Sequence, residues 1–193
     1  MQNLQNVICI TDRHLCRRPF PDQMRIVAAL HPKAVILREK DVMEDTYKLL
    51  AERVLPVCEE YDVPLIIHTF YQVALDLGVD RLQISLQKLR ELPEETRKQF
   101  SVIGTTVHSV EDAREAVSLG ATYLTASLAT GGAHEKYGEQ NRLLVFLEEV
   151  SHAVDVPVYA MGGASREDMD DCLAKGAAGI CMMSRLMTMD DGE

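Results

Sequence analysis

Residues 102–127 read VIGTTVHSVEDAREAVSLGATYLTAS and contain one complete strand–helix–strand unit. A β-branched, apolar run ends at Thr106, and Ser109 follows as a helix-capping residue with two acidic side chains in the first turn. Gly120 ends the helical pattern, and a second apolar run begins at Tyr123. Runs this apolar are typical of parallel strands that are covered on both faces of a sheet.

The same unit recurs along the whole chain. Eight apolar runs predict strands at Val7–Thr11, Ala34–Arg38, Pro64–His68, Arg81–Ser85, Val102–Thr106, Tyr123–Ser127, Pro157–Met161 and Ala178–Met183. Helical patterns lie between them, at Met43–Tyr61, from near Tyr71 to Gly78, at Leu143–Val154 and from Ser165 to Gly176. Because no change in composition marks a linker, this order predicts one TIM (β/α)8 barrel domain over residues 1–193. An open doubly wound sheet fits the even spacing less well, and no GxGxxG motif follows the first strand.

The end of the chain departs from a complete barrel. About ten residues follow the last predicted strand, and Met187–Glu193 is too short and too acidic to form a full eighth helix. We therefore expect the last helix to be shortened or missing. An apolar patch left exposed at that face would favour a homodimer.

Composition excludes several classes of protein. The 193 residues carry 20 basic and 30 acidic side chains, a net charge of −10, without the basic cluster that nucleic-acid binding requires. No apolar run is long enough to cross a membrane, and the first residues do not form a secretory signal. The five cysteines are scattered without a CxxC pair, which indicates reduced thiols in a cytoplasmic protein.

Two glycines and a serine suggest a phosphate site. In a (β/α)8 barrel the carboxyl ends of the strands form the active site. Gly162 and Gly163 follow the seventh strand, and Met183 and Ser184 end the eighth. Backbone N–H groups in such turns can point at one phosphate dianion. A tight strand-to-helix turn without a ligand is the alternative.

Arg38 and Lys40 form a second candidate, at the end of the second strand. Arginine offers a bidentate fork and lysine a point charge, so the pair could hold a ligand's anionic groups. Alternatively, Glu39 and Asp41 neutralise these cations.

Three histidines are candidate acids or bases. His68 and His108 are each the first ionisable side chain after an apolar strand, and His134 lies in a glycine-rich loop. His68 and His108 could instead serve only as hydrogen-bonding groups of their loops. The loop that carries His134 could be a lid over the site or only a mobile, solvated loop.

The order of these motifs resembles the thiamine phosphate synthases and their sister branch, the thiazole tautomerases. The resemblance covers nearly the whole chain and rests on Ile10-Thr11-Asp12-Arg13, Leu37-Arg38-Glu39-Lys40, Ile103-Gly104-Thr105-Thr106-Val107-His108-Ser109, Gly120-Ala121, Met161-Gly162-Gly163, Gly176-Ala177-Ala178-Gly179-Ile180 and Met183-Ser184. It implies a barrel of thiamin biosynthesis. The synthases join a hydroxymethylpyrimidine diphosphate to a thiazole phosphate, with loss of pyrophosphate.

The resemblance also implies roles for individual residues. Arg38 and Lys40 match the family's diphosphate contacts, and Gly162, Gly163 and Ser184 match its thiazole phosphate site. Thr106 takes the place of a family serine and keeps its hydroxyl group, and His108 matches directly.

Two departures concern the Mg²⁺ ion of the synthases. They carry Asn-Asp where this chain has His68-Thr69, and Gly-Gln-x-Asp where it has Ser85-Leu86-Gln87-Lys88. Neither threonine nor lysine supplies the anionic oxygen that Mg²⁺ prefers, so we expect no metal ligand at these positions. The tautomerase branch also lacks these aspartates. The sequence thus favours a tautomerase-like barrel that binds a thiazole phosphate or thiamin phosphate, with His108, His134 or His68 in proton transfer. A true synthase with a rebuilt site, a noncatalytic binder and a barrel enzyme outside thiamin metabolism stay open.

Overall fold

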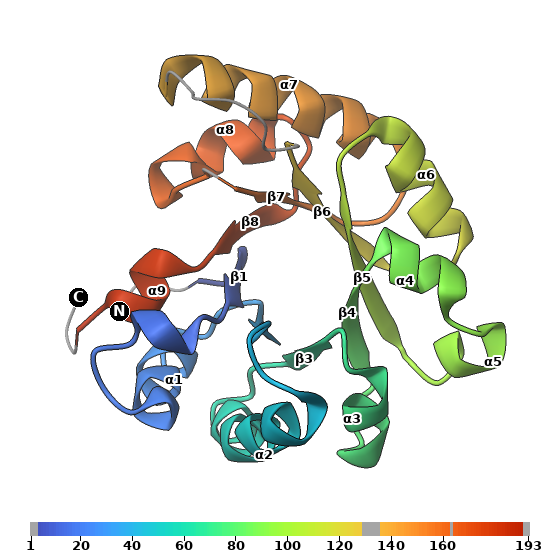
Figure 1. Cartoon of the computed structure of the whole chain (residues 1–193). Helices are drawn as coiled ribbons and strands as arrows, with labels where there is room; N and C mark the ends of the chain where they lie inside the picture. Colours follow the sequence, from blue (N-terminus) through green and yellow to red (C-terminus); the bar gives the residue numbers. More distant parts are fainter. Residues whose placement is uncertain (1–3, 129–135, 163, 191–193) are drawn as a thin grey trace. The chain divides into compact units, whose positions relative to one another are not determined.

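The computed structural model describes residues 4–128, 136–162 and 164–190 (Figure 1). Their eight strands form a closed barrel in the order of the sequence, which confirms the predicted TIM barrel. The strands are β1 Val7–Ile10, β2 Ala34–Leu37, β3 Leu65–His68, β4 Arg81–Ser85, β5 Val102–Val107, β6 Tyr123–Ser127, β7 Val158–Met161 and β8 Gly179–Met182. The backbone divides into two compact units, residues 1–83 with 182–193 and residues 84–181.

The first unit contains β1 to β3 and most of β4. Its strands pair in parallel, with Cys9 beside Val35 and Ile36 beside Ile66 in the register. The helices of this unit are η1 Arg13–Leu15, α1 Phe20–Ala28, α2 Glu44–Glu60, α3 Tyr71–Asp76 and α9 Ser184–Thr188. All four residues of β1 and of β2 are buried, as expected for strands covered on both faces.

The second unit contains β5 to β7 and most of β8, again in parallel register. Its helices are α4 Leu86–Glu91, α5 Glu94–Arg97, α6 Val110–Ser118, α7 Lys136–Ala153, η2 Arg166–Asp168 and α8 Met169–Ala174. The predicted caps are confirmed. Ser109 accepts the N–H of Asp112 at 3.0 Å, and Ser165 and Asp168 form a capping box at the start of η2.

Three α-helices, α1, α4 and the four-residue α5, have no counterpart in the sequence prediction. Helix α1 begins after Pro19 and carries a second proline in its first turn, a position where a missing N–H costs nothing. Helix α4 begins directly after β4, because the Ser85 hydroxyl accepts the N–H of Lys88 at 3.3 Å. Lys88 therefore lies in a helical turn and not in a strand-end loop.

The last helix is short, as predicted. Helix α9 has five residues, yet Leu186 and Met187 are buried. Gln23 of α1 is also buried, and its Nε2 donates to the carbonyl oxygens of Leu186 at 2.8 Å and Met189 at 3.2 Å. This amide holds α9 beside α1 (Figure 1). Among the described residues of α9 no large apolar side chain is exposed, so a homodimer stays a prediction without support from that face.

None of the five cysteines, all of which lie in the described residues, forms a disulfide, and Cys9, Cys58, Cys172 and Cys181 are buried. Cys16 is partly buried, and this burial, together with the nearby Glu39 carboxylate, raises the pKa of its thiol. No helix in the described part of the chain is long and apolar enough to span a membrane.

Tyr47 of α2 fixes the ends of two strands. It is fully buried, and its hydroxyl donates to the Leu37 carbonyl oxygen at 2.6 Å and accepts the His68 N–H at 2.9 Å. Burial raises the pKa of this phenol well above its ordinary value. Its ring also contacts Phe70, with ring centroids 4.7 Å apart.

We expect Tyr47→Phe to lower the free energy of unfolding by about 1–3 kcal/mol, because two buried backbone groups lose their partner. Urea denaturation followed by circular dichroism measures the change. Tyr71→Phe is the matched control, because Tyr71 is 39% exposed. Equal stability of both variants would show that water replaces the Tyr47 hydroxyl.

Candidate functional site

Arg38 and Lys40 lie at the end of β2, where the sequence places an anion site. Arg38 is half-buried and Lys40 is exposed. In the part of the chain that the structure describes, no carboxylate lies within ion-pair distance of either side chain. The Arg38 guanidinium and partial burial lower the pKa of Lys40, as expected for two neighbouring cations without a counterion.

Glu39 and Asp41, the neighbours in sequence, pair elsewhere. The Glu39 carboxylate is buried and accepts from Arg13 Nη1 at 2.9 Å. Asp41 accepts from the same guanidinium, at 2.6 Å for Oδ1, and contacts His14 Nε2 at 2.9 Å. The hydrogen bonds from Arg13, then from His14, hold the pKa of Asp41 well below its ordinary value. Within the described residues these two carboxylates therefore pair with Arg13 and His14, and not with Arg38 or Lys40.

His68 ends β3 and is followed by a residue in an unusual conformation. Its Nδ1 lies 3.1 Å from the Thr69 hydroxyl. Thr69 has φ 73°, a left-handed conformation that a β-branched residue rarely adopts. The Thr69 N–H donates to the Gln83 carbonyl oxygen at 2.8 Å, which helps to hold this backbone in place. His68 is thus fixed in the first unit, by Tyr47 on its backbone and Thr69 on its ring.

His108 follows β5 and is exposed, with one ring nitrogen anchored. Its Nδ1 lies 2.8 Å from the Ser127 carbonyl oxygen. Because a carbonyl oxygen only accepts, Nδ1 carries the proton, and Nε2 of the neutral ring is left as a proton acceptor. Among the described residues no group bonds to Nε2. This arrangement is suited to a general base.

Thr106 lies near the end of β5 and Gly162 directly follows β7, both in the second unit. The Thr106 hydroxyl lies 2.9 Å from that of Thr125, its register partner on β6. Gly162 has φ 86°, and a Cβ there would lie 3.3 Å from the Ser127 hydroxyl. Both facts favour glycine at this turn. Sequence reasoning missed Thr125, which lies inside a strand and is fully buried.

Four further residues are predicted from the sequence as phosphate-binding or acid–base groups. Met183 and Ser184 belong to the first unit, where Met183 precedes α9 and Ser184 begins it. Gly163 and His134 lie outside the described residues. The phosphate and acid–base roles of these four residues stay predictions.

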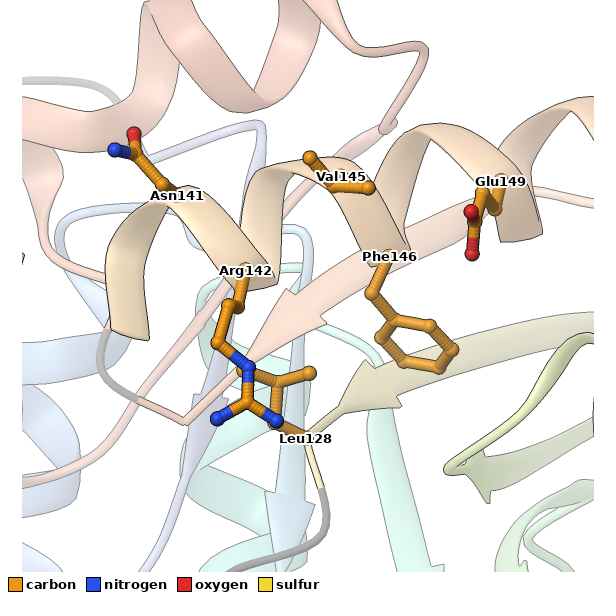
Figure 2. A pocket seen from close by; sticks show the side chains of 6 residues that line it. All are labelled: Leu128, Asn141, Arg142, Val145, Phe146 and Glu149. Atoms are coloured by element: carbon orange, nitrogen blue, oxygen red, sulfur yellow. The ribbon is translucent and has the colours of Figure 1, made fainter. Parts of the chain in front are cut away.

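A separate depression of about 350 Å³ lies on α7, lined by Leu128, Asn141, Arg142, Val145, Phe146 and Glu149. In Figure 2 Arg142 points toward Leu128, which follows β6, Phe146 points to the same side of α7, and Val145 points to the opposite side. None of the predicted site residues lines this depression.

Thr69 and Lys88 occupy the two positions at which the family resemblance implies Mg²⁺ ligands. Thr69 offers a neutral hydroxyl group and Lys88 an ammonium group. Within the described ranges no three His, Cys, Asp or Glu side chains are grouped as metal ligands.

Comparison with known proteins identifies the family. The sequence profile described as thiamine monophosphate synthase matches residues 7–186. A putative thiamine-phosphate synthase 2 of Aquifex aeolicus is 29% identical over 185 residues, which cover 95% of this chain and 98% of the relative. Thiamine-phosphate synthase 2 of Streptococcus pneumoniae is 31% identical and covers 82% of this chain and 76% of its own.

A solved structure supports the same assignment. Thiamine phosphate pyrophosphorylase from Pyrococcus furiosus aligns with a TM-score of 0.77 at 27% identity, over 98% of this chain and 92% of that chain. The profile, the relatives and the barrel agree with the motifs at the strand ends. The chain therefore belongs to the thiamine monophosphate synthase family, a family of transferases in thiamin biosynthesis.

Proposed function

We propose that this chain acts in the cytoplasm on a phosphorylated thiazole, a thiazole phosphate or thiamin phosphate, and transfers a proton as the tautomerase branch does. Arg38 and Lys40 of the first unit are the proposed anion-binding residues, and His108 of the second unit is the proposed general base. None of the proposed steps uses a metal ion.

The observation that carries the anion site is the pair of uncompensated cations. Glu39 and Asp41 are bound by Arg13, while Arg38 and Lys40 have no carboxylate partner in the described part of the chain. A phosphate group would accept from the guanidinium fork and from the ammonium group. It would also relieve the repulsion that lowers the pKa of Lys40.

The proton transfer is supported by the tautomer of His108. Its hydrogen bond to the Ser127 carbonyl oxygen fixes the ring and leaves Nε2 as the basic nitrogen. A base of this kind needs no metal, and the synthase aspartates are replaced by Thr69 and Lys88. His68 is the alternative base. The role of His134 stays a prediction.

A second candidate is true synthase activity, which the names of the relatives favour. In that reaction Arg38 and Lys40 would stabilise the charge that develops on the departing pyrophosphate. A noncatalytic binder would keep the anion site without turnover.

We expect Arg38→Met/Lys40→Met to weaken thiazole phosphate binding by about 100-fold or more, because two charge-assisted hydrogen bonds are lost. Isothermal titration calorimetry measures the affinity. The control Lys33→Met/Arg53→Met removes the same charge from exposed positions of the same unit and should bind like the wild type. Unchanged affinity in the first variant would rule out this anion site.

We expect the protein to incorporate solvent deuterium into a bound thiazole phosphate in D₂O, and His108→Gln to slow this by roughly 100-fold or more. Proton NMR of the ligand measures the rate. His152→Gln is the matched control, because His152 Nδ1 also lies near a carbonyl oxygen, that of Glu148 at 2.7 Å. Undiminished exchange in His108→Gln would assign the base to another residue.

The two enzymatic candidates differ in their products. Incubation with a hydroxymethylpyrimidine diphosphate and a thiazole phosphate should yield no thiamin phosphate, with Mg²⁺ or with EDTA, if the chain is only a tautomerase. Liquid chromatography of the products decides this. Coupling that survives EDTA would instead establish a synthase that needs no metal, and coupling that EDTA abolishes would show that residues other than Thr69 and Lys88 bind a metal ion.

A further inference from the structure

The buried Glu39 carboxylate is the centre of a small network at the ends of β1 and β2. The residue is 2% exposed, and Oε1 accepts from the Thr11 hydroxyl at 2.8 Å. The same oxygen accepts the Arg13 N–H at 3.1 Å, and Oε2 accepts from Arg13 Nη1 at 2.9 Å. The buried carboxylate of Glu39 therefore has its hydrogen-bond partners within the fold, in Thr11 and Arg13.

Thr11 connects this carboxylate to the backbone of the anion site. It is fully buried, and its hydroxyl group donates its proton to Glu39. Its oxygen accepts the Arg38 N–H at 2.9 Å. Because β2 ends at Leu37, Arg38 is the first residue after the strand. The hydrogen bond to its N–H fixes its backbone and thereby the position from which its side chain extends.

The network also separates charges. The Arg13 guanidinium binds the carboxylates of both Glu39 and Asp41. These carboxylates are therefore paired with Arg13 and not with the neighbouring cations. Glu39 lies just after β2 and Asp41 in the turn that follows, and both carboxylates reach the same Arg13 guanidinium. Without Arg13, two carboxylates would compete with a phosphate ligand for Arg38 and Lys40.

We propose that Thr11, Glu39 and Arg13 are positioning residues, which hold the Arg38 backbone and keep two carboxylates away from the cations so that these bind an anion. The inference rests on the proposed anion site at Arg38 and Lys40. Thr11 and Glu39 act through other groups and do not touch the ligand.

The experiment measures inorganic pyrophosphate binding to the full chain by calorimetry at 25 °C, with melting temperatures recorded in parallel. We expect Thr11→Val to weaken binding by about tenfold, because the Arg38 N–H and Glu39 each lose a partner. Thr11→Ser keeps both hydrogen bonds and should bind within about twofold of the wild type.

Thr122→Val is the matched control. Its hydroxyl also makes two hydrogen bonds with backbone, to the N–H and the carbonyl oxygen of Ile103 at the start of β5. It should lower stability without a change in pyrophosphate affinity. Arg13→Met should weaken binding more than Thr11→Val, because it releases the charges of Glu39 and Asp41 together.

The outcomes separate the two proposals. If Arg38→Met/Lys40→Met loses binding while Thr11→Val and Arg13→Met keep the wild-type affinity, the positioning role is wrong and the anion site stands. If the double variant binds pyrophosphate like the wild type, the anion site is wrong. If Thr11→Val lowers the melting temperature but leaves the pyrophosphate affinity at 25 °C unchanged, Thr11 only stabilises the fold and the positioning role is wrong. Failure of Thr11→Ser to restore binding would also contradict the proposal.

Discussion

A carboxylate that is buried must be compensated, and the first unit depends on how Glu39 meets this requirement. Its oxygens are satisfied by Thr11 and by both the backbone and the side chain of Arg13. Removal of one partner from such a group typically costs more than the interaction contributes, because the remaining charge stays buried. The segment after β2 is therefore tied to the segment after β1, whatever ligand binds there.

Side chains satisfy backbone groups at several strand ends of this barrel. A parallel strand that stops leaves polar groups without a strand partner, and these must bond elsewhere when they are buried. The Tyr47 hydroxyl forms hydrogen bonds with two of them. The Thr11 hydroxyl accepts from the Arg38 N–H, and the His108 ring bonds to the Ser127 carbonyl oxygen. In each case the same hydrogen bond that completes the fold also fixes a residue that the proposed chemistry needs.

The sequence predicts the fold well, because a (β/α)8 barrel repeats one local pattern eight times. The eight predicted strands agree with the structure to within about one residue at each end. Helices α1 and α4 are not predicted, because proline opens one and a strand-end serine caps the other. The anion site is predicted only in part. Its two cations are visible in sequence, but the partner of Glu39 is Arg13, 26 residues away, and no periodicity reveals such a pair.

The Gln23 amide joins α1 to Leu186 and Met189, two buried residues near the end of the described chain. A truncation before Leu186 would remove both carbonyl acceptors from a buried side chain, at a cost of about 1–3 kcal/mol, and would also uncover apolar surface of α1. Arg18 would lose its partner Asp190 as well. An affinity tag or a fusion partner is therefore best joined beyond Asp190, where it disturbs neither contact.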